Sequence, residues 1–154
     1  MSHLTEAGIR ALSEALDDEY LSWATYDQVI ADFGDLPPFN NIREAEARHI
    51  KALISLFVRY GLPVPANPWP GKVGRYASRQ ESCEAGVTAE IANAKMYDRL
   101  LGTTQNVDIL AVLRNLQEAS QQRHLPAFQR CAQGTAGDGR GCSERRGQGQ
   151  MGQP

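Results

Sequence analysis

Residues 46–53 read EARHIKAL, and residues 121–128 read QQRHLPAF. Both stretches place an arginine before a histidine, and follow it with an aliphatic residue, one further residue, an alanine and a large apolar residue. His49 and His124 are two of only three histidines in the chain. Two copies of one histidine phrase in so short a sequence suggest an internal repeat.

The repeat extends to the segments that precede the histidines. EYLSWATYDQVI (19–30) aligns with EIANAKMYDRLL (90–101). Both segments have a glutamate, six residues, Tyr-Asp, a polar residue and two aliphatic residues. We therefore interpret the chain as two copies of one helical hairpin, packed face to face about an approximate two-fold axis.

Apolar residues spaced by three and four positions predict four helices, at about 5–33, 40–60, 79–101 and 108–132. Between the second and third helices, LPVPANPWPGKVGRYAS (62–78) contains four prolines and two glycines and predicts a long crossover loop. The expected fold is all-α, an up-down-up-down four-helix bundle with this crossover between helices two and three.

The 154-residue chain is expected to form one domain, a bundle over residues 1–133 followed by a Gly-rich disordered tail over 134–154. A net charge of -2 provides no basic field for nucleic acid. No apolar run approaches the roughly 18 residues that a membrane span requires. The first twenty residues lack the pattern of a secretory signal, so none is expected.

The three cysteines form no CxxC pair, which argues against a zinc ribbon or a thioredoxin-type motif. Cys83 opens the third predicted helix and Cys131 closes the fourth, so their Cα atoms are expected near the roughly 4.4–6.8 Å window of a disulfide. Two buried free thiols are the alternative in a reducing cytosol. The compartment is left open: cytoplasmic on this sequence, extracytoplasmic if a signal was trimmed and the disulfide forms. Cys142 is expected to be unpaired.

Glu19, Glu46 and Glu90 lie on apolar helix faces, where an unpaired carboxylate costs several kcal/mol or takes up a proton. A bound divalent cation would remove this cost, and Glu46 and His49 are three residues apart and can reach one ion. In the alternative without metal, the glutamates form hydrogen bonds to the two histidines and to Tyr26 and Tyr97. For these tyrosines, core packing is preferred to a redox or ligand-supporting role.

A glutamate on one helix and Glu-x-x-His on the next, repeated in a second hairpin, resembles the ferritin-like di-iron and di-manganese carboxylate proteins, including rubrerythrins. More narrowly, the chain is similar to small bacterial ferritin-like proteins of unknown function. The resemblance covers about residues 8–132 and implies one or two ions of iron or manganese. The ligands that it implies are Glu19, Glu46, His49, Glu90 and His124. Glu19 and Glu90 would be candidates for bridging carboxylates.

The resemblance implies a non-haem oxidoreductase of peroxidase or ferroxidase type that acts on dioxygen or peroxide, and it allows a homodimer. The family pattern has a glutamate at the position of Gln121, so one half-site is expected to lack a carboxylate. Pro126 removes a helical hydrogen bond beside this position and predicts an irregular fourth helix. The alternative function is a non-catalytic metal-binding or purely structural bundle, such as a stress or storage accessory protein.

Overall fold

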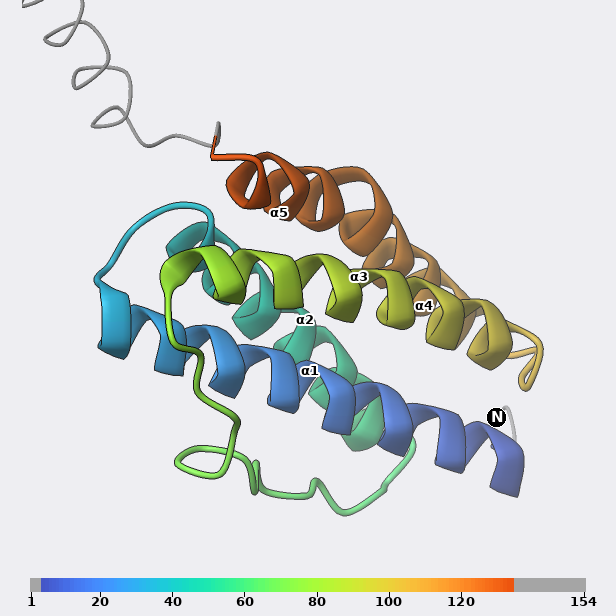
Figure 1. The fold of residues 1–154 in the computed structure, drawn as a ribbon. Coiled ribbons are helices and arrows are strands. Elements are labelled where there is room, and N and C mark those ends of the chain that lie inside the picture. The colour runs from blue at the N-terminus through green and yellow to red at the C-terminus, as the bar shows by residue number, and fades with distance from the viewer. Residues whose placement is uncertain (1–3, 135–154) are drawn as a thin grey trace, which may run out of the picture.

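The structure, a computed structural model, describes residues 4–134. These residues form helices and no strand, which confirms the predicted all-α fold (Figure 1). The elements are α1 (Glu6–Phe33), α2 (Phe39–Arg59), α3 (Arg79–Leu101), α4 (Val107–Ala119), the π-helical turn η1 (Ser120–His124) and α5 (Leu125–Ala132). His3 and Cys142 lie outside the described residues, as does the predicted tail beyond Gly134.

Short polar side chains and one glycine set the helix ends. Thr5 Oγ1 accepts the N–H of Gly8 at 3.1 Å and begins α1, and Ser78 Oγ accepts the N–H of Glu81 at 3.1 Å and begins α3. Just beyond the end of α2, Gly61 has a φ of 68°, in the left-handed region that favours glycine. These signals agree with the helix limits expected from the sequence.

Ion pairs between the helices define their directions. Arg43 near the start of α2 pairs with Asp27 in the second half of α1 at 2.8 Å, so these helices are antiparallel. Near the end of α3, Arg99 pairs with Glu14 in the first half of α1. The helices α2 and α3 therefore run in the same direction, and α4 and α5 return beside α3 (Figure 1). The order is up-down-down-up, and the up-down-up-down order expected from the sequence is wrong.

The connection over residues 60–78 explains this order. It contains no helix or strand and runs back along α1 (Figure 1). The Tyr20 hydroxyl donates to the Pro65 carbonyl at 2.7 Å, Trp69 Nε1 donates to Asp17 at 3.0 Å, and Arg75 forms an ion pair with Asp32. Because the connection spans the length of the bundle, α3 starts at the same end as α2 and not at the opposite end.

The core consists of two apolar clusters with a polar layer between them. The first cluster contains Leu12, Leu16, Leu53, Leu100 and Leu113 among its buried residues. The second cluster contains Tyr26, Val29, Phe39, Ile42, Cys83, Phe128 and Cys131. The buried polar residues of the layer include Glu19, Glu46, Glu90 and His124. The helices α1, α2 and α3 contribute to both clusters, α4 contributes to the first and α5 to the second, so the polar layer lies between apolar packing at both ends.

A disulfide joins Cys83 near the start of α3 to Cys131 near the end of α5, with the Cα atoms 5.6 Å apart. The predicted proximity of these two residues is confirmed. The bridge lies within the second apolar cluster, beside Phe128.

Within residues 4–134, no helix is long and apolar enough to cross a membrane.

Gly86 permits close packing between α3 and α5. A Cβ atom at this position would lie 2.6–2.9 Å from ring atoms of Phe128, which is fully buried. We predict that Gly86→Ala lowers the free energy of unfolding by about 1–2 kcal/mol, because overpacking outweighs the helix propensity of alanine. Urea unfolding measures the change.

The matched control is Gly74→Ala. Gly74 lies in the connection, and a Cβ atom there would meet nothing within 4 Å. This substitution should change the free energy of unfolding by less than about 0.5 kcal/mol. Equal effects of the two substitutions would contradict the packing argument.

Candidate metal centre

All five residues proposed as ligands from the sequence lie in the polar layer. Glu19 comes from α1, Glu46 and His49 from α2, Glu90 from α3, and His124 from η1. The three glutamates are at most 2% exposed, and His124 is 4% exposed. Four helical segments thus converge on one site. The helical repeat placed these residues on the inner faces, and antiparallel pairing within each hairpin brought them to one height.

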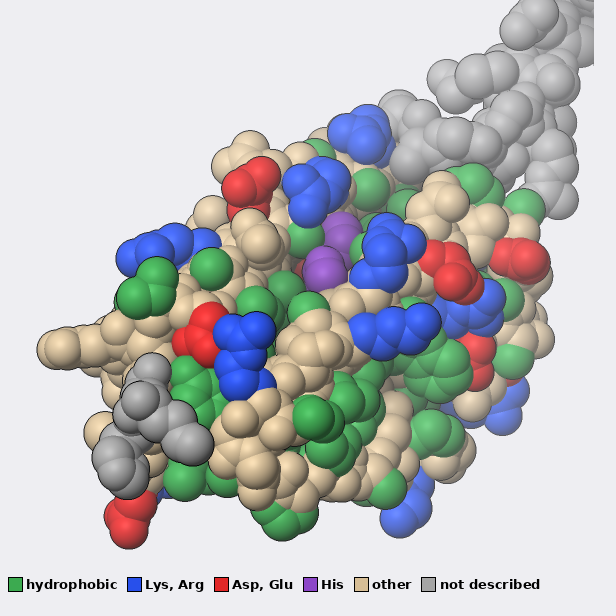
Figure 2. Space-filling view, turned by 180° about the vertical axis from the view of Figure 1, so that it is seen from behind, with side chains coloured by type: hydrophobic (Ala, Val, Ile, Leu, Met, Phe, Trp, Pro, Cys, Tyr) green, Lys and Arg blue, Asp and Glu red, His purple; other side chains and the backbone are tan. Residues whose placement is uncertain are grey.

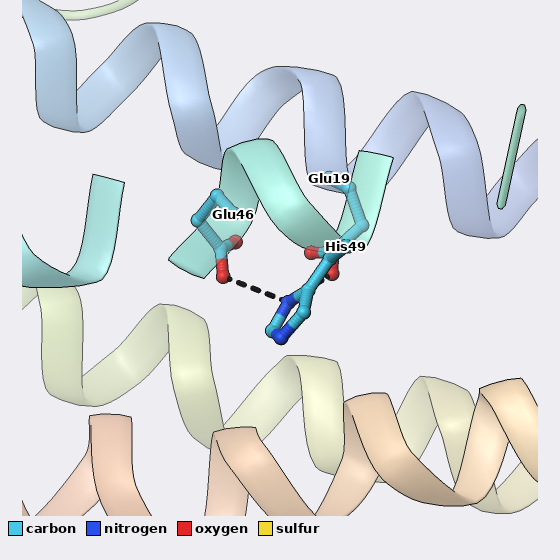
Figure 3. A group of neighbouring side chains, drawn as sticks. All are labelled: Glu19, Glu46 and His49. Atoms are coloured by element: carbon cyan, nitrogen blue, oxygen red, sulfur yellow. Dashed lines mark ion pairs between the residues drawn. The ribbon is translucent and has the colours of Figure 1, made fainter. Parts of the chain in front are cut away.

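Glu19, Glu46 and His49 form the more compact half of the site (Figure 3). One ligand atom from each lies within 4.8 Å of the others. His49 Nδ1 is 2.8 Å from Glu19 Oε1 and 3.2 Å from Glu46 Oε1. It nevertheless has no hydrogen-bond partner of adequate geometry. Its nitrogen therefore faces the two carboxylates without a directed hydrogen bond to either.

The other half contains Glu90 and His124. His124 Nδ1 lies 3.5 Å from Glu90 Oε1 and 3.4 Å from Glu46 Oε1. The two imidazole rings stack with centroids 5.7 Å apart. Glu46 Oε1 thus faces both histidines, whereas Glu19 pairs with His49 alone and Glu90 with His124 alone. Glu46 is thus the one carboxylate of the three that faces both histidines, and the bridging of metal ions by Glu19 and Glu90 stays a prediction.

The π-helical turn changes which residue precedes His124 on the inner face. In this turn the N–H of Leu125 bonds to the carbonyl of Ser120, five residues back, so the turn holds an extra residue. Ser120 is consequently buried at 3% exposure, and Gln121 is exposed. The sequence places Gln121 on the inner face with His124, which is wrong, because Gln121 is exposed and Ser120 lies there instead. The expectation that this half lacks the carboxylate of the family pattern stays a prediction.

Pro126 gives the physical reason for the irregular turn. A proline lacks the N–H that an α-helix requires, and its ring clashes with the carbonyl four residues earlier. The π turn ends at His124, directly before the first turn of α5 that contains Pro126. The predicted irregularity is present, but its effect on the register could not be read from a regular helical period.

Glu90 is held by two hydroxyl groups. Tyr26 donates to Glu90 Oε2 at 2.8 Å, and Ser120 donates to Oε1 at 2.6 Å. Tyr26 therefore supports a proposed ligand in addition to packing in the core. Tyr97, its equivalent in the repeat, has a buried hydroxyl without a partner. The repeat is thus symmetric in sequence here and asymmetric in hydrogen bonding.

Burial raises the pKa of Glu46 well above its ordinary value, and the charges of Glu19 and Glu90 raise it further. Burial first, and then the charges of nearby carboxylates, raise the pKa of Tyr26 and of Tyr97. Glu46 Oε2 has no hydrogen-bond partner. Glu46 therefore favours a proton or a neighbouring cation.

The distances in the site match the size of a coordination sphere. Two ligand atoms each about 2.1 Å from an ion are about 3.0 Å apart at a right angle and about 3.4 Å apart at a tetrahedral angle. The four distances between Nδ1 and carboxylate oxygens are 2.8–3.5 Å. Imidazole and carboxylate donors suit iron, manganese and zinc. The residues present therefore fit a metal ion.

Asp18 and Asn93 form a further polar pair beside the centre, between α1 and α3, which the sequence reading missed. With its amide nitrogen turned toward Asp18, Asn93 donates to Asp18 Oδ2 at 2.6 Å. Burial, followed by the charges of Glu19 and Glu90, raises the pKa of Asp18 to about 7. Asp18 lies beside Glu19 on the helix, so only the packing of α3 reveals its environment.

The fold is similar to that of the hypothetical protein MJ0754 from Methanococcus jannaschii DSM 2661, known from a crystal structure. The TM-score is 0.76, the sequence identity is 23%, and the match covers 87% of this chain and 84% of that one. At this identity the likeness shows the fold alone. Neither a family model nor a curated protein matches the sequence.

The raised pKa of Asp18 predicts a pH dependence for the metal-free protein. Its ordinary value is 3.8 and its folded value about 7, so between these values the folded state holds a proton that the unfolded chain releases. The free energy of unfolding should fall as pH rises from about 4 to about 7. Asp18→Asn should lessen that fall, as measured by urea unfolding with chelator at pH 5 and pH 7.5.

Asp35→Asn is the control for a lost carboxylate, because Asp35 is exposed and distant from the polar layer. Its pH dependence should equal that of the unsubstituted protein. If Asp18→Asn also left the pH dependence unchanged, the assignment to Asp18 would be wrong.

Proposed function

We propose that Glu19, Glu46, His49, Glu90 and His124 bind one or two ions of iron or manganese. The observation that carries the proposal is Glu46: one oxygen faces the Nδ1 atoms of both histidines, and the other has no partner. A buried carboxylate in such a position is stabilised by a cation. The compact half, with Glu19 and His49, is the stronger site because it contains two carboxylates.

We propose further that the bundle is ferritin-like. Support comes from its two antiparallel hairpins and its single long connection, over residues 60–78, which together give the up-down-down-up order. Ferritin-like bundles have one such crossover and place metal ligands on the inner faces of all four helices. The convergence of ligands from α1, α2, α3 and η1 agrees with this arrangement.

The proposed activity is oxidation–reduction with dioxygen or peroxide as substrate. Iron or manganese in such a site supplies one-electron redox chemistry. The chain's own contribution is to hold the donors in a largely buried layer. Tyr26 and Ser120 fix the orientation of Glu90, and Glu46 is positioned to contact both halves.

The second candidate function is that of a structural bundle without catalysis. The hydrogen bonding of Glu90 favours it. Both oxygens of Glu90 already accept hydrogen bonds from hydroxyl groups, so this carboxylate is satisfied without metal. A proton on Glu46, whose pKa is raised by burial, would lower the charge of the layer. Metal binding distinguishes the two candidates.

The purified protein should bind at least one equivalent of Fe(II) or Mn(II) under anaerobic conditions. Glu46→Gln should weaken binding by about 10- to 100-fold, because the amide keeps the shape but removes the charge shared by both histidines. Calorimetry and elemental analysis measure affinity and stoichiometry. The proposal would be contradicted if Glu46→Gln bound metal as tightly as the unsubstituted protein, or if the unsubstituted protein bound no metal. If the bound metal were oxidised by neither dioxygen nor peroxide, this result would favour the non-catalytic candidate.

The register of the π turn predicts the effect of adding a carboxylate. Ser120→Glu should raise metal stoichiometry toward two, because residue 120 faces Glu90 from the inner face. Gln121→Glu is the matched control: it adds the same charge one residue away, on the exposed face, and should leave stoichiometry unchanged. A higher stoichiometry for Gln121→Glu alone would show that this register is incorrect.

A further inference from the structure

A cleft opens at the surface beside the second half of the candidate centre. Its volume is about 380 Å³, within the lower range of small-molecule sites. It lies between the first part of α2, with the Pro37–Pro38 turn before it, and the segment from η1 into α5. His124 is the one proposed ligand in its lining. The cleft therefore leads from solvent to a residue of the buried layer.

The polar lining of the cleft is cationic. Arg48, Arg123 and Arg130 line it, and none of its lining residues is acidic. Figure 2 shows the histidine side chains in purple within a hollow, with arginine or lysine side chains in blue beside them. This positive rim contrasts with the carboxylates beneath it and with a net charge of -2 for the whole chain. A cleft of this charge favours anions.

Two of the arginines have guanidinium groups available to a ligand. Arg48 is exposed and forms no ion pair within residues 4–134. Arg123 forms an ion pair with Glu118 at 3.7 Å, and both side chains are more than 60% exposed. Such an exposed pair contributes little and is easily replaced. Planar guanidinium groups bind carboxylate and phosphate oxygens with paired hydrogen bonds.

The rest of the lining is mainly apolar. Besides the arginines, Asn41 and His124 are the polar side chains of the lining, and the other residues are Pro37, Pro38, Ile42, Ala45 and Ala127. An inorganic anion alone would leave these apolar walls in contact with water. An anion with an apolar body would cover the walls while its charged group reached the arginines.

We propose that this cleft binds a small organic anion, with its charged group at Arg48 and Arg123 and its apolar body against Ile42 and Ala127. The charged group is a carboxylate or a phosphate ester, which share the oxygen geometry that guanidinium recognises. The role of this anion as a substrate of the centre rests on the proposed function. Its binding to the cleft does not require metal. The bound anion would lie beside His124.

The test measures binding of benzoate, phenyl phosphate, benzamide and inorganic phosphate to the metal-free full-length chain, by calorimetry and NMR titration. Benzoate or phenyl phosphate should bind at least about 10-fold more tightly than benzamide and inorganic phosphate. The tighter of the two identifies the charged group. Arg48→Gln and Arg123→Gln should each weaken that binding by about 5- to 10-fold.

Arg10→Gln is the matched control, because Arg10 is an exposed arginine on α1, outside the cleft lining. It removes the same charge and should leave binding unchanged, and thermal unfolding should show that all variants are folded. Equal binding of benzoate and benzamide, equal binding of inorganic phosphate, or an equal loss in Arg10→Gln would overturn the proposal.

Metal binding is measured on separate samples, so failure of the cleft proposal can be distinguished from failure of the proposed function. Protein that binds Fe(II) but neither benzoate nor phenyl phosphate overturns the cleft proposal alone. Protein that binds the organic anion at the arginines but no metal supports the anion site and overturns the proposed function.

Discussion

The burial of three carboxylates between two apolar clusters is the constraint that governs this molecule. Glu19, Glu46 and Glu90 are almost fully removed from solvent. Burial raises the pKa of Glu46 and of neighbouring Asp18, and the charges of Glu19 and Glu90 raise both further. Two imidazoles, two hydroxyl donors and the Asn93 amide are gathered around them. The polar layer therefore requires four helical segments at one height, which makes the relative placement of the hairpins part of the site itself.

The two hairpins provide similar residues but unequal environments. Glu19 and Glu90 match in the repeat, as do Tyr26 and Tyr97, yet Tyr26 donates to Glu90 while the Tyr97 hydroxyl has no partner. The π turn adds to this difference by bringing Ser120 to the place that Glu46 occupies in the first hairpin. One half is thereby rich in carboxylate, and the other is satisfied by hydroxyl groups. This asymmetry gives Glu46 its position between the two histidines.

The same π turn connects the buried layer with the surface. It turns Gln121 outward, places His124 inward, and carries Arg123 to the cleft rim. His124 thus belongs both to the buried polar layer and to the lining of the arginine-bearing cleft. Cations inside and organic anions outside are the ligands that such a charge distribution favours.

Local sequence patterns were sufficient for much of the structure. Helical spacing and the proline-rich segment predicted the helix limits, the repeat predicted the five inward-facing residues, and the helix ends predicted the proximity of Cys83 and Cys131. These features depend on periodicity and on turn-forming residues, which are local properties.

Four features were decided by tertiary structure. The direction of α3 depends on the path of residues 60–78 along α1, and a loop's composition does not define its path. The exchange of Gln121 for Ser120 depends on a π turn, which breaks the period from which faces are read. The position of Glu46 between the two histidines and the raised pKa of Asp18 depend on side chains from other helices. The sequence by itself therefore determined most of the residues that face the core, but not those of the π turn. Packing between helices decided which of them meet, because electrostatic and hydrogen-bonding contacts form between segments far apart in the chain.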